Sequence, residues 1–99
     1  MFQAILTDNQ VLAEVRRLVR IGKIRWKAHA ETRMAERGYE RGQVKQCLLS
    51  GRFIEAPTVP NKAGDLQYVF KISANIDGMP IDVVASLYPE AKVVVITVI

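Results

Sequence analysis

Residues 81–99 read Ile81-Asp-Val-Val-Ala-Ser-Leu87-Tyr-Pro-Glu-Ala-Lys92-Val93-Val-Val-Ile-Thr-Val-Ile99. The last seven side chains are all β-branched, and such residues favour extended strands. Between the two apolar runs, Pro89–Lys92 has the composition of a turn. We therefore predict strands at Ile81–Leu87 and Val93–Ile99, joined tightly. Because nearly every side chain of the second strand is apolar, we expect that strand to be buried on both faces.

The same kind of pattern continues upstream of these strands. Side chains alternate between two faces in Leu66–Ser73, which predicts another strand with one buried side. Asn75–Gly78 has the residues of a turn, and Asn61–Asp65 has those of a loop. Phe53–Glu55 is a candidate short strand ahead of two prolines. Its exposed edge is one place where a partner strand could pair.

Three helices are predicted ahead of the strands. Val11, Val15 and Leu18 recur with a helical period, while Ala28–Arg37 lacks Gly and Pro and is rich in good helix formers. A glycine follows each segment and is expected to stop it. The helices are expected from the N-cap Asp8 to Gly22, over Ala28–Arg37 before Gly38, and from about Glu40 to Ser50 before Gly51, with a short strand or extended link at Lys23–Lys27.

The order of these elements predicts the fold class. Helices come first and strands joined by tight turns come last, so neighbouring strands are expected to pair in sequence. We predict an α+β fold in which two to three N-terminal helices pack on one face of an antiparallel β-meander. A chain of 99 residues is expected to form one domain, 1–99, with a helical part at about 8–50 and a sheet part at about 53–99.

Cysteine and histidine usage limits the chemistry. The one cysteine, Cys47, is expected in the core on the apolar face of the third helix. It forms no internal disulfide, and one cysteine with one histidine gives no metal-ligand spacing, so no metal or other cofactor is expected. The chain start lacks the basic segment of a signal peptide, and no run approaches the roughly 18 apolar residues of a membrane span. We expect a cytoplasmic protein without membrane contact.

Charge is unevenly distributed along the chain. Residues 1–52 hold 11 Lys and Arg against 5 Asp and Glu, a net of +6. Residues 53–99 hold 3 against 5, a net of −2. A basic first half points towards a polyanion or an acidic partner, although basic chains without such a partner are also common.

The only histidine opens the segment His29-Ala-Glu-Thr-Arg33-Met-Ala-Glu-Arg37-Gly38. On a helix, His29, Arg33 and Arg37 lie four residues apart and share a face. Histidine is the residue type that most readily exchanges a proton near neutral pH, and guanidinium groups bind phosphates through forked donors. The combination suits a phosphodiester, which the cations would hold while the imidazole moves a proton. The alternative is an ordinary solvated helix face with arginines paired to nearby glutamates.

Four more side chains are candidates for contact with a substrate. Lys71 lies on the polar side of its predicted strand, and Tyr88 lies at a strand end where it could stack a base. Arg16 and Arg20 on the first helix are candidates for phosphate contacts or for an acidic partner. For the three cations the alternative is a solvated surface position, and for Tyr88 it is packing.

The motif His29-Ala-x-x-Arg33-Met34-x-x-Arg37-Gly38, followed by Val44, Leu48-x-x-Gly51 and Glu55, resembles the small bacterial domain-of-unknown-function family 4258. The closing strand, Val95-Ile96-Thr97-Val98, is also similar to that of the family. The resemblance covers about residues 24–99, and the helix with one histidine and two arginines is its most specific part.

The resemblance implies a fold and an activity. The family is grouped with RelE/barnase-like nucleases, which include ribonuclease toxins of toxin–antitoxin pairs. It therefore implies a compact α+β fold, an RNA substrate and a mechanism without metal. His29, Arg33 and Arg37 match the motif, and Thr97 matches on the last strand. The family often closes on a tyrosine after that threonine, whereas this chain closes on Val98-Ile99.

The leading hypothesis is a metal-independent endoribonuclease toxin. His29 would be the general acid or base, Arg33 and Arg37 would stabilise the phosphorane, and Glu31 or Glu36 is a candidate second proton carrier. The partners would be RNA, free or on the ribosome, and an antitoxin protein. The alternatives are a non-catalytic RNA- or protein-binding module of the same fold and a purely structural interaction protein.

Overall fold

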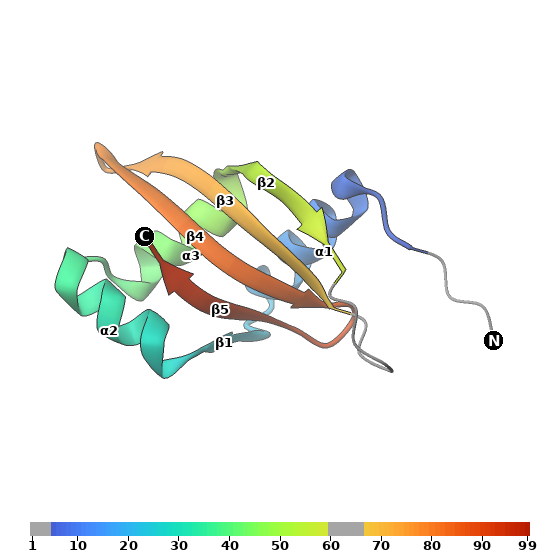
Figure 1. Ribbon diagram of the computed structural model, residues 1–99, viewed down its shortest axis with the longest axis horizontal. Coiled ribbons are helices and arrows are strands. Elements are labelled where there is room, and N and C mark those ends of the chain that lie inside the picture. Colours follow the sequence, from blue (N-terminus) through green and yellow to red (C-terminus); the bar gives the residue numbers. More distant parts are fainter. Residues whose placement is uncertain (1–4, 60–66) are drawn as a thin grey trace.

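Figure 1 shows the computed structural model of the chain, which describes residues 5–59 and 67–99. The predicted loop at Asn61–Asp65, and Leu66 at the start of a predicted strand, lie outside the described residues. The helices are α1 (Asp8–Arg20), α2 (Ala28–Arg37) and α3 (Arg41–Ser50), and the strands are β1 (Ile24–Trp26), β2 (Arg52–Thr58), β3 (Tyr68–Ile76), β4 (Met79–Tyr88) and β5 (Lys92–Val98).

The strands form one sheet in the order β1-β5-β4-β3-β2. From β2 to β5 the sheet is the predicted antiparallel meander. At its edge β1 adds a parallel strand beside β5, with Ile24 opposite Val93 and Trp26 opposite Val95. Parallel neighbours need a long connection, and here everything from α2 to β4 lies between them in the chain. The predicted α+β class is confirmed, and the sheet is mixed because of this one strand.

One face of the sheet carries the core. In Figure 1, α1 and α3 lie behind the sheet, and α2 lies beside the end of β5. Each large aliphatic side chain buried there stabilises the fold by about 1.5–3 kcal/mol. The buried apolar side chains are Val11, Val15, Leu18, Val19, Val44, Cys47 and Leu48 from α1 and α3, and Tyr68, Phe70, Ile72, Ile76, Ile81, Val83, Ala85, Leu87, Val93, Val95 and Val98 from β3 to β5.

No helix among the described residues covers the opposite face, which we call the open face. On β5 its side chains are half-exposed, whereas Val93, Val95 and Val98 are buried on the core face. The prediction that the last strand is buried on both faces is therefore wrong. A β-branched side chain suits either face of a strand, so composition does not show which face has a layer over it. The open face includes Val69, Lys71, Ser73, Asp82, Val84, Tyr88, Val94 and Thr97.

The connection between β3 and β4 is tighter than the sequence predicted. Ile76 pairs with Met79, so the turn consists of Asp77 and Gly78 alone. Both have positive φ, 52° and 81°, as a two-residue type I′ hairpin turn requires. The predicted turn at Asn75–Gly78 therefore shrinks to two residues, and both strands lengthen.

The helix ends follow local chemistry. The N-cap of α1 is Thr7 rather than Asp8, because Thr7 and Gln10 form a reciprocal capping box. Helix α2 ends as predicted at Gly38, which adopts the left-handed conformation with φ 73°. Among residues 5–59 and 67–99, no helix has the length and apolarity to cross a bilayer.

Candidate functional site

Helix α2 presents three distinct flanks. Ala30 and Met34 are buried against the core. On one side of them, Glu31 forms an ion pair with Arg41 at the start of α3, behind the sheet. On the other side, Arg33 reaches β5. The row His29–Arg33–Arg37 therefore lies on the flank of α2 that faces away from α3.

Arg33 is held on the outer edge of β5. Its Nε donates to the carbonyl oxygen of Val98 at 3.3 Å, and the hydroxyl of Thr97 donates to the same oxygen at 3.2 Å. Strand β1 ends at Trp26, opposite Val95, so no strand continues the pairing alongside Val98. The guanidinium takes the place of the missing strand donor. A second contact, 3.6 Å from Nη1 to Oε1 of Glu36, also orients it.

The other two members of the row are free. His29 and Arg37 are exposed, and within the described ranges neither forms a hydrogen bond or an ion pair with another residue. The structure therefore brings Arg33 and Thr97 together, with an imidazole one helical turn before Arg33 and a second guanidinium one turn after it.

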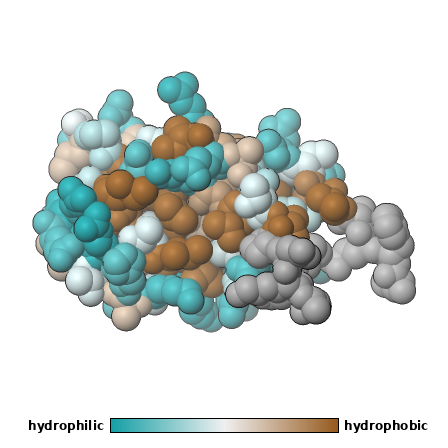
Figure 2. All heavy atoms as spheres, in the orientation of Figure 1, coloured by the Kyte–Doolittle hydropathy of each residue, from teal (hydrophilic) through white to brown (hydrophobic). Residues whose placement is uncertain are grey.

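Register places the remaining open-face candidates relative to Thr97. In one row, Thr97 lies opposite Val84, which lies opposite Lys71. Lys71 is half-buried and ion-paired with Glu55 of β2 at 3.4 Å. Tyr88 lies at the other end of β4, with the Lys92 ammonium 5.2 Å from its ring centroid. Figure 2 shows hydrophobic side chains along the middle of this face and hydrophilic ones around α2.

Sequence reasoning missed Asp82, which lies on the open face in β4. Its Oδ1 accepts a 2.6 Å hydrogen bond from the Ser73 hydroxyl of β3. The available signal was an aspartate inside a predicted strand, since aspartate is depleted in strands.

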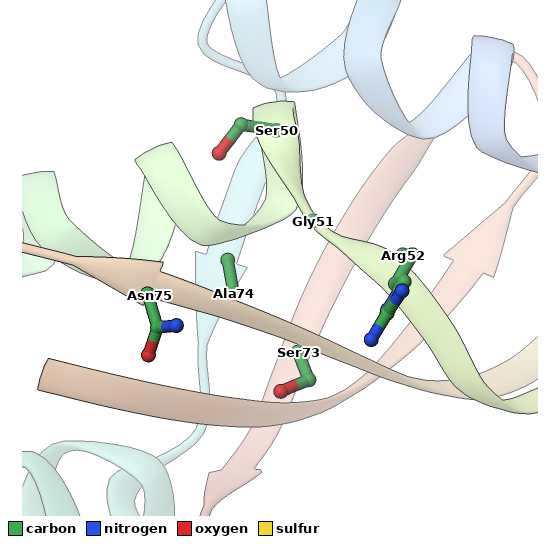
Figure 3. A pocket seen from close by; sticks show the side chains of 6 residues that line it. All are labelled: Ser50, Gly51, Arg52, Ser73, Ala74 and Asn75. Carbon is green, nitrogen blue, oxygen red and sulfur yellow. The ribbon is translucent and has the colours of Figure 1, made fainter.

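A shallow pocket of about 350 Å³ adjoins this position. In Figure 3, Arg52, Ser73 and Asn75 point to the same side of β3, while Ala74 points to the other. The lining is completed by Ser50 and Gly51 at the end of α3. Arg52 pairs with Ser73 across the β2–β3 ladder, so the pocket and Asp82 belong to one row of the sheet.

The two candidates on α1 lie in another layer. Nη2 of Arg16 donates to the carbonyl of Gly51 at 3.0 Å, and its buried Nε has no hydrogen-bond partner in the described part of the chain. Arg20 is exposed in the last turn of α1. The helix that carries both packs behind the sheet, so the structure does not bring them to the open face.

Potential metal ligands and nucleophiles are sparse among the described residues. In the described residues, no three His, Cys, Asp or Glu side chains gather in a metal-binding arrangement. Cys47 is buried as predicted, and burial together with the charge of Asp82 raises the pKa of its thiol to about 12. A thiol held in that protonated form is a poor nucleophile at neutral pH.

The comparison with protein-family models gives the same family that the motif on α2 resembles. No curated protein and no solved structure matches the chain. A family model described as a domain of unknown function, DUF4258, matches residues 26–99, which include all of α2, α3 and β2 to β5 and the last residue of β1. The chain therefore belongs to the DUF4258 family.

Proposed function

We propose that this protein is a metal-independent endoribonuclease whose active site lies where α2 borders the open face at β5. One observation carries the proposal. The Arg33 guanidinium is fixed on the Val98 carbonyl beside the Thr97 hydroxyl, with His29 and Arg37 exposed one turn to either side.

The Arg33 guanidinium is already held in place before substrate binds, which suits it to stabilise the negative charge of a phosphorane. Arginine has five N–H donors, and only Nε of Arg33 is used by Val98. Nη1 lies 3.6 Å from Oε1 of Glu36, and Nη2 has no partner among the described residues. The Nη2 donors are left to hold the oxygens of a phosphorane, and they need no reorganisation when charge develops. Arg37, free on the surface, binds an adjacent phosphate.

A cleavage mechanism without a metal ion limits the substrate to RNA. The 2′-hydroxyl of RNA is an internal nucleophile, which DNA lacks, so cleavage needs proton transfer and charge stabilisation without a metal-bound water. His29 supplies the proton to the leaving 5′-oxygen. The grouping of the family with RelE/barnase-like nucleases, which the resemblance implies, favours the same assignment.

We infer further that the enzyme is of the toxin type and that a protein antitoxin controls it. Because His29 and Arg37 are exposed and unpaired among the described residues, an acidic partner lying along this flank of α2 would block the phosphate site. Co-expression with the product of a neighbouring short reading frame tests this, since a true antitoxin restores growth.

The direct test uses purified protein and a labelled single-stranded RNA of mixed sequence in the presence of EDTA. Wild type is expected to yield fragments ending in 2′,3′-cyclic phosphate, and His29→Ala to lose at least about 100-fold in rate. Lys45→Gln on α3, behind the sheet, is the matched control and should cleave normally.

Two results contradict the proposal. Fragments that persist in His29→Ala would come from a contaminating nuclease or another residue. RNA that binds to wild type but stays intact would favour the non-catalytic binding module.

A further inference from the structure

The open face holds a carboxylate that no part of the proposed mechanism uses. Asp82 lies within β4, half-buried, with Oδ1 bonded to the Ser73 hydroxyl. Its Oδ2 forms no hydrogen bond with a described residue. Aspartate is depleted in β-strands, so a functional role would explain its presence in β4.

Register places Asp82 beside the proposed active site. The backbone N–H of Ile99 donates to the Asp82 carbonyl, which continues the β4–β5 pairing past Val83 and Val98. Thr97 is therefore the diagonal neighbour of Asp82 on the same face, and such neighbours have Cα atoms about 7–8 Å apart. A ribose held against Thr97 and Arg33 is within reach of the Asp82 carboxylate.

The chemistry needs a second proton carrier, and the other carboxylates nearby are occupied. Cleavage removes a proton from the 2′-hydroxyl and adds one to the 5′-oxygen. Glu31 is paired with Arg41 behind the sheet, Glu36 with Arg33, and Glu55 with Lys71. Asp82 is the carboxylate of the open face without an ion pair among the described residues.

We propose that Asp82 is the general base of the RNA cleavage, an assignment that rests on the proposed function. The 2′-hydroxyl proton passes to Oδ2 of Asp82, and the 2′-oxygen forms a bond to phosphorus. The bond from phosphorus to the 5′-oxygen breaks, its electron pair leaves with that oxygen, and the oxygen takes the proton of the His29 imidazolium. The products are a 2′,3′-cyclic phosphate and a 5′-hydroxyl.

Ser73 is then a positioning residue. Its hydroxyl donates to Oδ1 and leaves Oδ2 without a hydrogen bond to a described residue. The charged and titratable groups around this carboxylate are Lys71 and Arg52 on the same face, Arg33 from α2, and the Cys47 thiol beneath the sheet.

The test compares Asp82→Asn with Glu55→Gln, which makes the same charge change on the same face. Rates are measured at saturating enzyme across pH, and affinity is measured with the fully 2′-O-methylated form of the same RNA, which cannot be cleaved. Asp82→Asn is expected to slow cleavage at least about 100-fold and to remove the acidic limb of the pH profile. Its affinity should stay within about two-fold of wild type, because a general base contributes to rate rather than to binding. Glu55→Gln should behave as wild type.

Ser73→Ala provides a second variant that keeps the carboxylate. Its cleavage rate should fall about ten-fold while its affinity for the 2′-O-methylated RNA stays within about two-fold of wild type, because Oδ1 loses the donor that positions it. Full activity in Asp82→Asn beside an active wild type overturns the role of Asp82 alone, as does a cleavage rate unchanged in Ser73→Ala. A wild type that binds the RNA without cleaving it overturns the proposed function and this role together.

Discussion

Arg33 of α2 and Thr97 of β5 meet at one atom, because both donate a hydrogen bond to the carbonyl oxygen of Val98, from 3.3 and 3.2 Å. The pair lies 64 residues apart in the chain. The pair satisfies the outer edge of β5 beyond the end of β1, and it holds Arg33 of the row His29–Arg33–Arg37 against the sheet. The guanidinium that closes this edge is therefore the same one that we propose binds the phosphate.

Arg33→Ala should therefore affect both stability and activity. We expect the free energy of unfolding to fall by about 1 kcal/mol, because Val98 loses a donor, and the cleavage rate to fall at least about 100-fold. Arg33→Lys should recover only part of the rate, since an ammonium lacks the forked geometry. Urea unfolding and RNA cleavage measure the two effects, and an Arg33→Ala variant that cleaves normally would contradict the assignment.

Arg37→Ala should separate binding from folding. The side chain is exposed and unpaired within the described residues, so the free energy of unfolding should change by less than about 0.5 kcal/mol. RNA affinity should fall, and the slope of log affinity against log salt should decrease by about 1, as for one lost phosphate contact. Fluorescence anisotropy over a salt series measures this. An unchanged slope would place the phosphate elsewhere.

Glu14 predicts an acid-sensitive part of the stability. It accepts hydrogen bonds of 2.8 Å from Nε and Nη2 of Arg17 and from the backbone N–H of Glu90, and the Arg17 bonds lower its pKa. A lowered folded-state pKa stabilises the fold above the ordinary glutamate pKa of about 4.3, and this contribution disappears as pH falls through the lowered value. Glu14→Gln should cost about 1 kcal/mol at pH 7 and nearly nothing once wild-type Glu14 is protonated. A cost in urea unfolding that is independent of pH would contradict this.

Gly51→Ala should destabilise the junction of α3 and β2. The added Cβ would lie 2.6 Å from the carbonyl oxygen of Cys47 and 2.7 Å from that of Ser73, both backbone atoms. We expect a loss of about 1–3 kcal/mol, as in other overpacked sites. Gly42→Ala in α3 is the control, because its Cβ meets nothing within 4 Å and alanine favours the helix by up to about 1 kcal/mol. Equal stabilities for the two variants would show that the junction adjusts freely.

Local pattern was sufficient for the elements and for the row on α2. Helix α2 has the predicted bounds, because good helix formers run without interruption from Ala28 to a glycine that stops the helix. The spacing of His29, Arg33 and Arg37 then places them on one flank in any α-helix. The β-branched run at the end of the chain likewise predicted β5 to within one residue at each end.

Long-range packing set the rest. The parallel pairing of β1 with β5, the contact of Arg33 with Val98, and the position of Asp82 beside Thr97 all join residues more than 12 positions apart. A local pattern gives the face and period of each element, but it carries no information on which strand is its neighbour or in what register they pair. The row His29–Arg33–Arg37 could therefore be identified from the sequence. The position of Asp82 next to Thr97 depends on the register of β4 and β5, which only the tertiary structure shows.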